Sequence, residues 1–248
     1  MITGRGHRLE SSLVSDMGEL LVSQLLTGIE AQGRLAGIIG DKPWSVDVAN
    51  GVLSFADGPS YRADLVGSAA ADPGTWLWAW ANRHLPEGAG AASDRLRRYG
   101  KEHSIDLLTT PSMPLSEPPD GIDPHLAGLL ATPLLDGDAY FLAQNGPQTV
   151  VLVLHDPSLR LGPLTGPDLR TTVTSGIGMY GTDHRAAIRS YLTRRGAELT
   201  EDGAEWVVRT ADGQETHVTF DGQGRLAGID AALSPDPPEP KRRRFWRR

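Results

Sequence analysis

The spacing of apolar residues changes along the chain, and each change predicts a different element. Between residues 12 and 33, apolar side chains recur every three or four positions, at Leu13, Met17, Leu20, Leu21, Leu25 and Ile29. This spacing places them on one stripe of an α-helix. Ser11 or Ser12 can cap the start of the helix, and Gly33 is suited to its C-terminal end.

After this helix the period drops to two, which is typical of strands. Turn residues separate four short alternating segments. Asn50-Gly51 gives the strongest hairpin signal, because a type I′ turn needs positive φ at both central residues. The pattern predicts an antiparallel meander of four strands at 44–49, 52–57, 61–68 and 75–81.

The middle of the chain mixes helices with a hairpin. The expected elements are helices at 89–103 and 124–135, a proline-rich loop at 109–121 between them, and a hairpin at 139–144 and 149–155. Asp123 and Pro124 are suited to begin the second helix. The last strand is continuously apolar, which favours a central position in the sheet.

A turn-rich stretch at 156–167 is the predicted boundary to a second unit. The elements expected beyond it are a helical region at 168–180, a helix capped by Asp183 and stopped by Gly196, and strands at 204–210, 215–220 and 225–233. The predicted fold class is α+β, with a curved antiparallel sheet packed on the N-terminal helix and further helices, plus a small helix-and-three-strand module. The predicted divisions are 1–158, 165–233 and a proline-rich spacer with a basic tail at 234–248.

Trp76, Trp78 and Trp80 occupy alternate positions in one predicted strand. They would share one face and form a ladder about 14 Å long. Three interpretations remain open: a packed core beneath the N-terminal helix, a partly open aromatic cleft for a planar or sugar-like ligand, and an exposed protein-binding patch. Asn82 and His84, just past the ladder, are best placed to orient a ligand at its mouth.

The same stretch carries a resemblance to a known family. The sequence "GTWLWAWAN" at 74–82, with "LVGS" and "WSVDVANGVLSFAD" before it, resembles an uncharacterised bacterial domain family. That family is defined mainly by a Gly-Thr-Trp-x-Trp-x-Trp-x-Asn box. The resemblance covers about residues 20–155 and implies no established activity.

The composition of the 248-residue chain indicates the kind of cell and compartment in which it is expected. It contains no cysteine, which excludes disulfides and thiolate chemistry and favours a reducing cytoplasm. Arginine outnumbers lysine 21 to 3, which suggests a GC-rich bacterial genome. No segment approaches the roughly 20 apolar residues that span a bilayer, and no signal peptide is recognisable.

The net charge of −7 conceals an asymmetry. The basic segment contributes six cations, so residues 1–240 carry 18 cations and 31 anions, a net charge of −13. We expect the segment to dock on an anionic membrane surface, at the inner face of the membrane, or on an acidic protein partner, with nucleic acid a weaker alternative. The residues of this basic segment are Lys241, Arg242, Arg243, Arg244, Phe245, Trp246, Arg247 and Arg248.

No motif in the sequence commits the chain to catalysis. The stretch "GIGMYG" at 176–181 matches a dinucleotide fingerprint but lacks the preceding apolar strand, so a helix break is the better interpretation. The histidines lack ligand spacing, and no metal or other cofactor is expected. The prediction is therefore a non-catalytic ligand- or protein-binding protein. The alternative is a small hydrolase or isomerase with a cone-shaped pocket, using His84, Glu87, Asp72 or His103 as acid or base.

Overall fold

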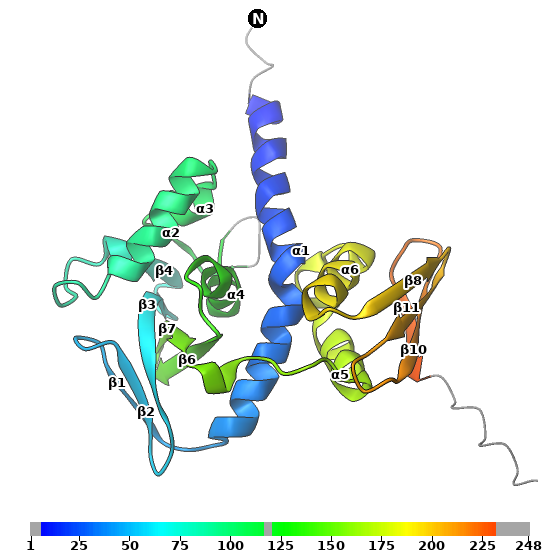
Figure 1. The fold of residues 1–248 in the computed structure, drawn as a ribbon. Coiled ribbons are helices and arrows are strands. Elements are labelled where there is room, and N and C mark those ends of the chain that lie inside the picture. Colours follow the sequence, from blue (N-terminus) through cyan, green and yellow to red (C-terminus); the bar gives the residue numbers. More distant parts are fainter. Residues whose placement is uncertain (1–5, 117–120, 232–248) are drawn as a thin grey trace, which may run out of the picture.

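The chain folds into two antiparallel sheets with helices between them (Figure 1). The computed structural model describes residues 6–116 and 121–231. Helices are segregated from the strands rather than alternating with them as in a parallel sheet, so the predicted α+β class is confirmed.

The helices are α1 Gly6–Ile39, α2 Ala91–Glu102, α3 Asp106–Thr109, α4 Pro124–Leu134, α5 Gly166–Gly176 and α6 His184–Arg195. Three short 3-10 turns are η1 Ala79–Ala81, η2 Pro157–Leu159 and η3 Met179–Gly181. The strands of the first sheet are β1 Trp44–Asp47, β2 Val52–Phe55, β3 Ser60–Ala70, β4 Thr75–Trp78, β5 Ser112–Pro114, β6 Ala139–Asn145 and β7 Gln148–His155. Those of the second sheet are β8 Glu198–Asp202, β9 Glu205–Arg209, β10 Glu215–Phe220 and β11 Leu226–Ala231.

The first helix is longer than the sequence predicts. α1 starts before Ser12 and continues past Gly33, which was expected to end it. Beyond Gly33, Leu35 and Ile39 are buried against the first sheet, and this burial outweighs the low helix propensity of one glycine. The helix instead ends before Gly40, whose φ of 53° gives the left-handed conformation common just after a helix.

β3 is the centre of the first sheet. Its first half pairs with β2, its second half with β4, and its other edge with β7, which also pairs with β6. The predicted four-strand meander and the central position of β7 are therefore confirmed. β5 was missed: this three-residue strand lies in the predicted loop and pairs with β4.

A bulge in β3 lets the sheet bury apolar residues on both faces. Leu65 pairs with Leu152 and Gly67 with Val151, so Val66 is an extra residue that shifts the alternation. Apolar residues before the bulge pack with the second half of α1, and those after it pack with α2, α3 and α4.

α4 is the helix that covers the tryptophan face of the sheet. Six consecutive residues of α4 are buried, because the helix lies between the sheet and α1. A helix that is apolar all round is typical of such a position. α1 adds Leu20 and Leu21 to the same cluster and lies along the edge strand β6, where Gln32 Nε2 donates to the carbonyl of Tyr140 at 2.9 Å. The N-terminal helix therefore contributes to the cluster that buries the tryptophans, as expected, but α4 contributes more of its residues.

The second module places α5 and α6 on one face of a four-stranded sheet with strand order β11-β10-β9-β8. Its three predicted strands and the capping of α6 by Asp183 and Gly196 are confirmed. The fourth strand, β8, was missed because its sequence "ELTED" has one apolar residue and no alternation. It forms because β9 offers a free edge for pairing.

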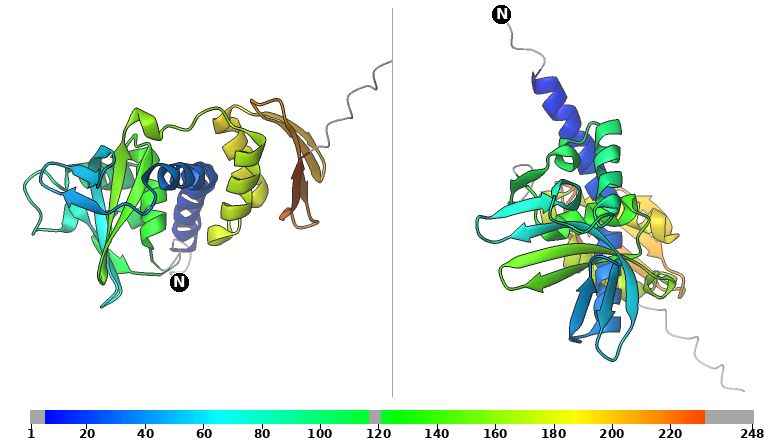
Figure 2. Two further views of the ribbon diagram at one scale, coloured as in Figure 1. Left: turned by 90° about the horizontal axis from the view of Figure 1, so that it is seen from below. Right: turned by 90° about the vertical axis from the view of Figure 1, so that its left-hand side faces the viewer.

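α1 joins the two parts of the molecule. Figure 2 shows it between the first sheet and its helices on one side and α5 and α6 on the other. Leu26 of α1 is buried with Val173 of α5 and Ile188 of α6, whereas Leu25 is buried with Leu129 of α4. The division at residues 158–165 stays a prediction, but the packing of both parts depends on α1.

Candidate functional site

Trp76 and Trp78 lie in the core. Both side chains are 0 % exposed, and their rings meet edge to face with centroids 5.3 Å apart. They share the face of β4 that lies beside Gly67 of β3. A Cβ on Gly67 would lie 2.5 Å from the Trp76 ring, so glycine is what allows the indole to lie against the strand.

The buried indole N–H groups of Trp76 and Trp78 differ in their hydrogen bonding. Trp78 Nε1 donates to the carbonyl of Leu107 at 3.1 Å, whereas Trp76 Nε1 has no hydrogen-bond partner among the described residues. An unpaired buried donor is unfavourable, so the packing of the Trp76 ring must outweigh it.

Trp80 does not continue the ladder. The strand ends at Trp78, and Trp80 lies in the 3-10 turn η1, half-buried, with the Arg97 guanidinium 4.3 Å from its ring centroid. Asn82 follows this turn, and its side-chain oxygen accepts from the backbone N–H of His84 at 3.0 Å. His84 itself is exposed. The predicted ladder of three is thus a pair, and the ligand-binding role of these five residues stays a prediction.

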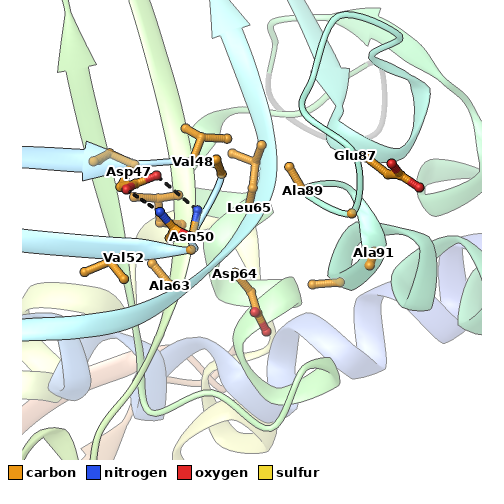
Figure 3. A pocket seen from close by; sticks show the side chains of 16 residues that line it. Asp47, Val48, Asn50, Val52, Ala63, Asp64, Leu65, Glu87, Ala89 and Ala91 are labelled. Atoms are coloured by element: carbon orange, nitrogen blue, oxygen red, sulfur yellow. Dashed lines mark hydrogen bonds between the residues drawn. The ribbon is translucent and has the colours of Figure 1, made fainter.

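A cleft of about 310 Å³ opens between the β1–β2 hairpin and the segment before α2. Its volume is at the lower end of the range of small-molecule sites. Figure 3 shows Asp47 and Asn50 on one wall, Ala89, Ala91 and Glu87 on the other, and Leu65 between them. The apolar lining residues are Val46, Val48, Ala49, Val52, Ala63, Leu65, Ala89, Ala91, Ala92 and Leu152.

The turn that builds one wall also fixes a negative charge there. Asp47 accepts from the Asn50 side chain at 2.8 Å and from the Asn50 backbone N–H at 3.0 Å. These bonds stabilise the carboxylate and lower the pKa of Asp47, so it stays ionised well below neutral pH. Glu87 is exposed on the opposite wall.

A third acidic residue borders the cleft from β3. Asp64 accepts from His155 Nε2 at 2.9 Å, and the two side chains are 17 % and 12 % exposed. Arg62 lies 3.5 Å from the same carboxylate. Asp64 is therefore engaged by cross-strand partners. Asp47 is the carboxylate beside the cleft floor, and Figure 3 shows the Glu87 carboxylate at the opposite rim, directed away from the other lining side chains.

The N-terminus of α2 opens toward the same cleft. Gly90 precedes the helix, and no side chain caps it. The partial positive charge of a helix N-terminus is roughly +0.5, smaller than the two full negative charges of Asp47 and Glu87. The cleft is therefore acidic on balance.

A larger groove of about 920 Å³ runs between α1, residues 161–163 and α5. The ion pair of Glu30 with Arg195 borders it, and Arg195 also donates to the carbonyl of Gly162 at 2.6 Å. Arg34 of α1 donates to the carbonyl of Ser158, which lies in the same segment between β7 and α5. The polar groups of this groove thus fasten the connection between the two parts of the chain.

Other sequence candidates are dispersed. Asp72 and His103 are exposed and border neither cleft, and His103 stacks on Tyr99 with centroids 3.9 Å apart. Residues 176–181 end α5 and form η3 before α6, which agrees with a helix break. The basic segment 241–248 lies outside the described residues.

The described part of the chain has neither a metal-ligand cluster nor a helix suited to a bilayer. In residues 6–116 and 121–231, no three His, Asp or Glu side chains lie together so as to hold a metal ion. In the same ranges, no helix combines the length and apolarity needed to cross a bilayer.

Sequence reasoning found the Asn50 turn but missed its role in a cleft. The turn signal is local, whereas the opposite wall comes from residues 87–92 and the floor from Leu65 and Leu152. Four segments that are separate in the sequence line the cleft, and the spacing of residues along the chain does not predict that they come together.

The fold and the cleft define an α+β protein with two antiparallel sheets, a shared central helix and an acidic, apolar-floored cleft at one end of the larger sheet. The chain belongs to a Family of unknown function (DUF6882), whose model matches residues 18–157. The match includes most of α1 and all of the first sheet, and it ends before the second module. No curated protein and no solved structure matches the chain.

Proposed function

We propose that this protein is a non-catalytic binding protein whose folded part takes a small ligand with an apolar portion and a cationic group. The observation that carries this proposal is the cleft, where an aliphatic floor lies beside the Asp47 carboxylate, with Glu87 at the opposite rim. An apolar floor gains free energy by excluding water from the ligand, and a carboxylate selects the charge of the ligand.

The packing beneath the tryptophans supports binding over catalysis. A large closed pocket containing His84 would have favoured a hydrolase or isomerase, whereas filled space favours a binding module. Trp76 and Trp78 are fully buried, and His84 is exposed. The side chains lining the cleft are aliphatic, acidic or amide, which suits recognition better than acid–base chemistry on a bound substrate.

The ligand proposal can be tested with three probes of one shape. Butylammonium, 1-butanol and butyrate would be titrated into the full chain while backbone amide shifts are recorded. We expect saturable shifts at Val48 and Asn50 that are strongest for butylammonium and weakest for butyrate. Ala91→Phe should abolish them by filling the cleft, and the matched variant Ala71→Phe, at an exposed site outside it, should not. Equal shifts for all three probes would contradict the charge argument.

We also propose that the basic segment recruits the protein to an anionic membrane surface. The segment has six cations in eight residues, and its other two residues are Phe245 and Trp246. Each cation near an anionic leaflet contributes about 1 kcal/mol to membrane binding, and the two aromatic rings are suited to the interface. The nine preceding residues, 232–240, include four prolines and act as a spacer.

Vesicle sedimentation tests this second part. Full-length protein should partition onto vesicles of phosphatidylcholine with 30 mol % phosphatidylserine, and a 1–240 truncation should not. Binding should weaken steeply with salt. Equal partitioning of the two proteins would eliminate the membrane role.

A further inference from the structure

The outer face of the second sheet is open and acidic. α5 and α6 cover the inner face, where Trp206, Val208 and Val218 are fully buried. Figures 1 and 2 show no described element over the other face. Five carboxylates lie on it, from all four strands: Glu198, Asp202, Glu205, Glu215 and Asp230.

The pairing register brings these carboxylates together. Asp202 of β8 lies directly opposite Glu205 of β9, and like charges in this position destabilise a sheet. His217 of β10 is the cross-strand neighbour of Asp230 and contacts the Glu205 carboxylate at 2.6 Å. The face therefore concentrates negative charge along its β8–β9 edge and at β11.

The cations on this face leave part of its charge unmatched. Arg209 interacts with both Glu198 and Glu215, and it lowers the pKa of Glu215. Among the described residues, Asp202 and Asp230 take part in no ion pair within 4 Å. A further cationic group would relieve the repulsion between Asp202 and Glu205.

We propose that this outer face, which we call the acidic face, is the docking surface for the chain's own basic segment, residues 241–248. The two are complementary in charge: the segment has six cations and no anion, and the folded part is strongly acidic. Half-buried Val207 at the centre of the face offers an apolar contact for the Phe245 or Trp246 ring.

The length of the connection allows this docking. β11 belongs to the acidic face and ends at Ala231, and nine residues, 232–240, separate it from Lys241. Nine residues in a proline-rich chain span up to about 28 Å. The face itself is about 20 Å along its longest strands and about 15 Å across its four strands. The segment can therefore reach every carboxylate of the face in the same molecule.

Tethering makes a weak contact sufficient. A short linker whose length matches the span between the two sites gives an effective concentration on the order of millimolar. A free peptide with a Kd of about 100 μM would then be roughly 90 % docked when tethered. Docking would compete with the membrane binding proposed above, so an anionic leaflet would have to displace the segment from the acidic face.

Carbodiimide cross-linking tests the docking directly, because it joins an amine to a carboxylate in contact with it. The chain has three lysines, Lys42, Lys101 and Lys241, and only Lys241 lies in the basic segment. In full-length protein at micromolar concentration, we expect mass spectrometry to find Lys241 joined to Asp202, Glu205 or Asp230. The cross-link should disappear in 1 M NaCl. Cross-links spread over the first module, or found only in dimers, would overturn the proposal.

A pair of charge-matched variants provides the control. The face variant carries Asp202→Asn, Glu205→Gln and Asp230→Asn. The control carries Glu19→Gln, Asp41→Asn and Glu102→Gln, three exposed carboxylates outside the acidic face. The face variant lacks the three acceptor carboxylates, so its informative readout is vesicle binding. It should bind the phosphatidylserine vesicles up to about tenfold more tightly, since its segment is already free. The control should match the unmodified protein.

Equal vesicle binding by the two variants would refute docking on the acidic face. Far-UV circular dichroism verifies that each variant is folded, and the single change Asp230→Asn gives a milder version of the same test. The cross-link reports on docking and sedimentation reports on membrane recruitment. Failure of one can therefore be distinguished from failure of the other.

Discussion

The ion pair that joins α1 to α6 gives the most direct test of how the two parts are held together. Arg195 donates to Glu30 through Nε at 2.7 Å and through Nη2 at 3.0 Å, a two-pronged geometry. Both side chains are only 11 % exposed. The Tyr191 hydroxyl donates to the same carboxylate at 2.9 Å, so Glu30 is the centre of a small buried network.

Removing both members should cost less stability than the sum of the two single removals. Arg195→Met leaves the Glu30 carboxylate buried without its cation, and Glu30→Gln leaves the cation, so each should lower the free energy of unfolding by about 3–5 kcal/mol. The double variant leaves no buried charge. Its loss should fall short of the sum of the two single losses by about 2 kcal/mol or more.

The assay is urea unfolding of the four proteins, followed by circular dichroism. Arg189 and Glu201 provide the matched control, because they form a similar two-pronged pair with contacts of 2.6 and 2.7 Å but are 49 % and 37 % exposed. Solvent screens such a pair, so the coupling between Arg189→Met and Glu201→Gln should be below about 1 kcal/mol. Equal coupling in the two cycles would refute the argument that burial decides the strength of the Glu30 pair.

Three further predictions concern the core. Gly67→Ala should destabilise the protein by at least about 1 kcal/mol in thermal unfolding, because its Cβ would meet the Trp76 ring. The control Gly18→Ala should be neutral or stabilising, because the space around Gly18 is open. Trp78→Phe should lower the unfolding free energy more than Trp76→Phe, by about 1 kcal/mol, since only Trp78 loses a hydrogen bond; the reverse order would contradict the assignment. Burial raises the pKa of Tyr140 above its ordinary value of 10, so its contribution to stability should be complete below pH 10 and decline above it. Burial also raises the pKa of Tyr191, so ultraviolet titration of Tyr140→Phe should show a late phenol step smaller by one tyrosine than in the unmodified protein.

Much of the local structure could be predicted because its causes are local. The Asn50-Gly51 turn, the Asp123 cap and the alternating segments each depend on neighbouring residues, and the structure has the corresponding elements. The same kind of reasoning failed at β8, whose sequence lacks alternation and which forms by pairing with β9. Gly33 indicated a possible helix end, but the helix continues because Leu35 and Ile39 are buried against the first sheet, whose residues are distant in the sequence.

The cleft and the acidic face could not be predicted from the sequence, for a different reason. Both depend on residues that are far apart along the chain and become neighbours only through strand register and helix packing. The sequence by itself determined the period of each element, most of the turns and caps, and the contrast between an acidic body and a basic segment. Tertiary structure decided that α4 covers the tryptophans, that α1 is shared by two modules, and where carboxylates gather, because these outcomes follow from which apolar surfaces can bury one another.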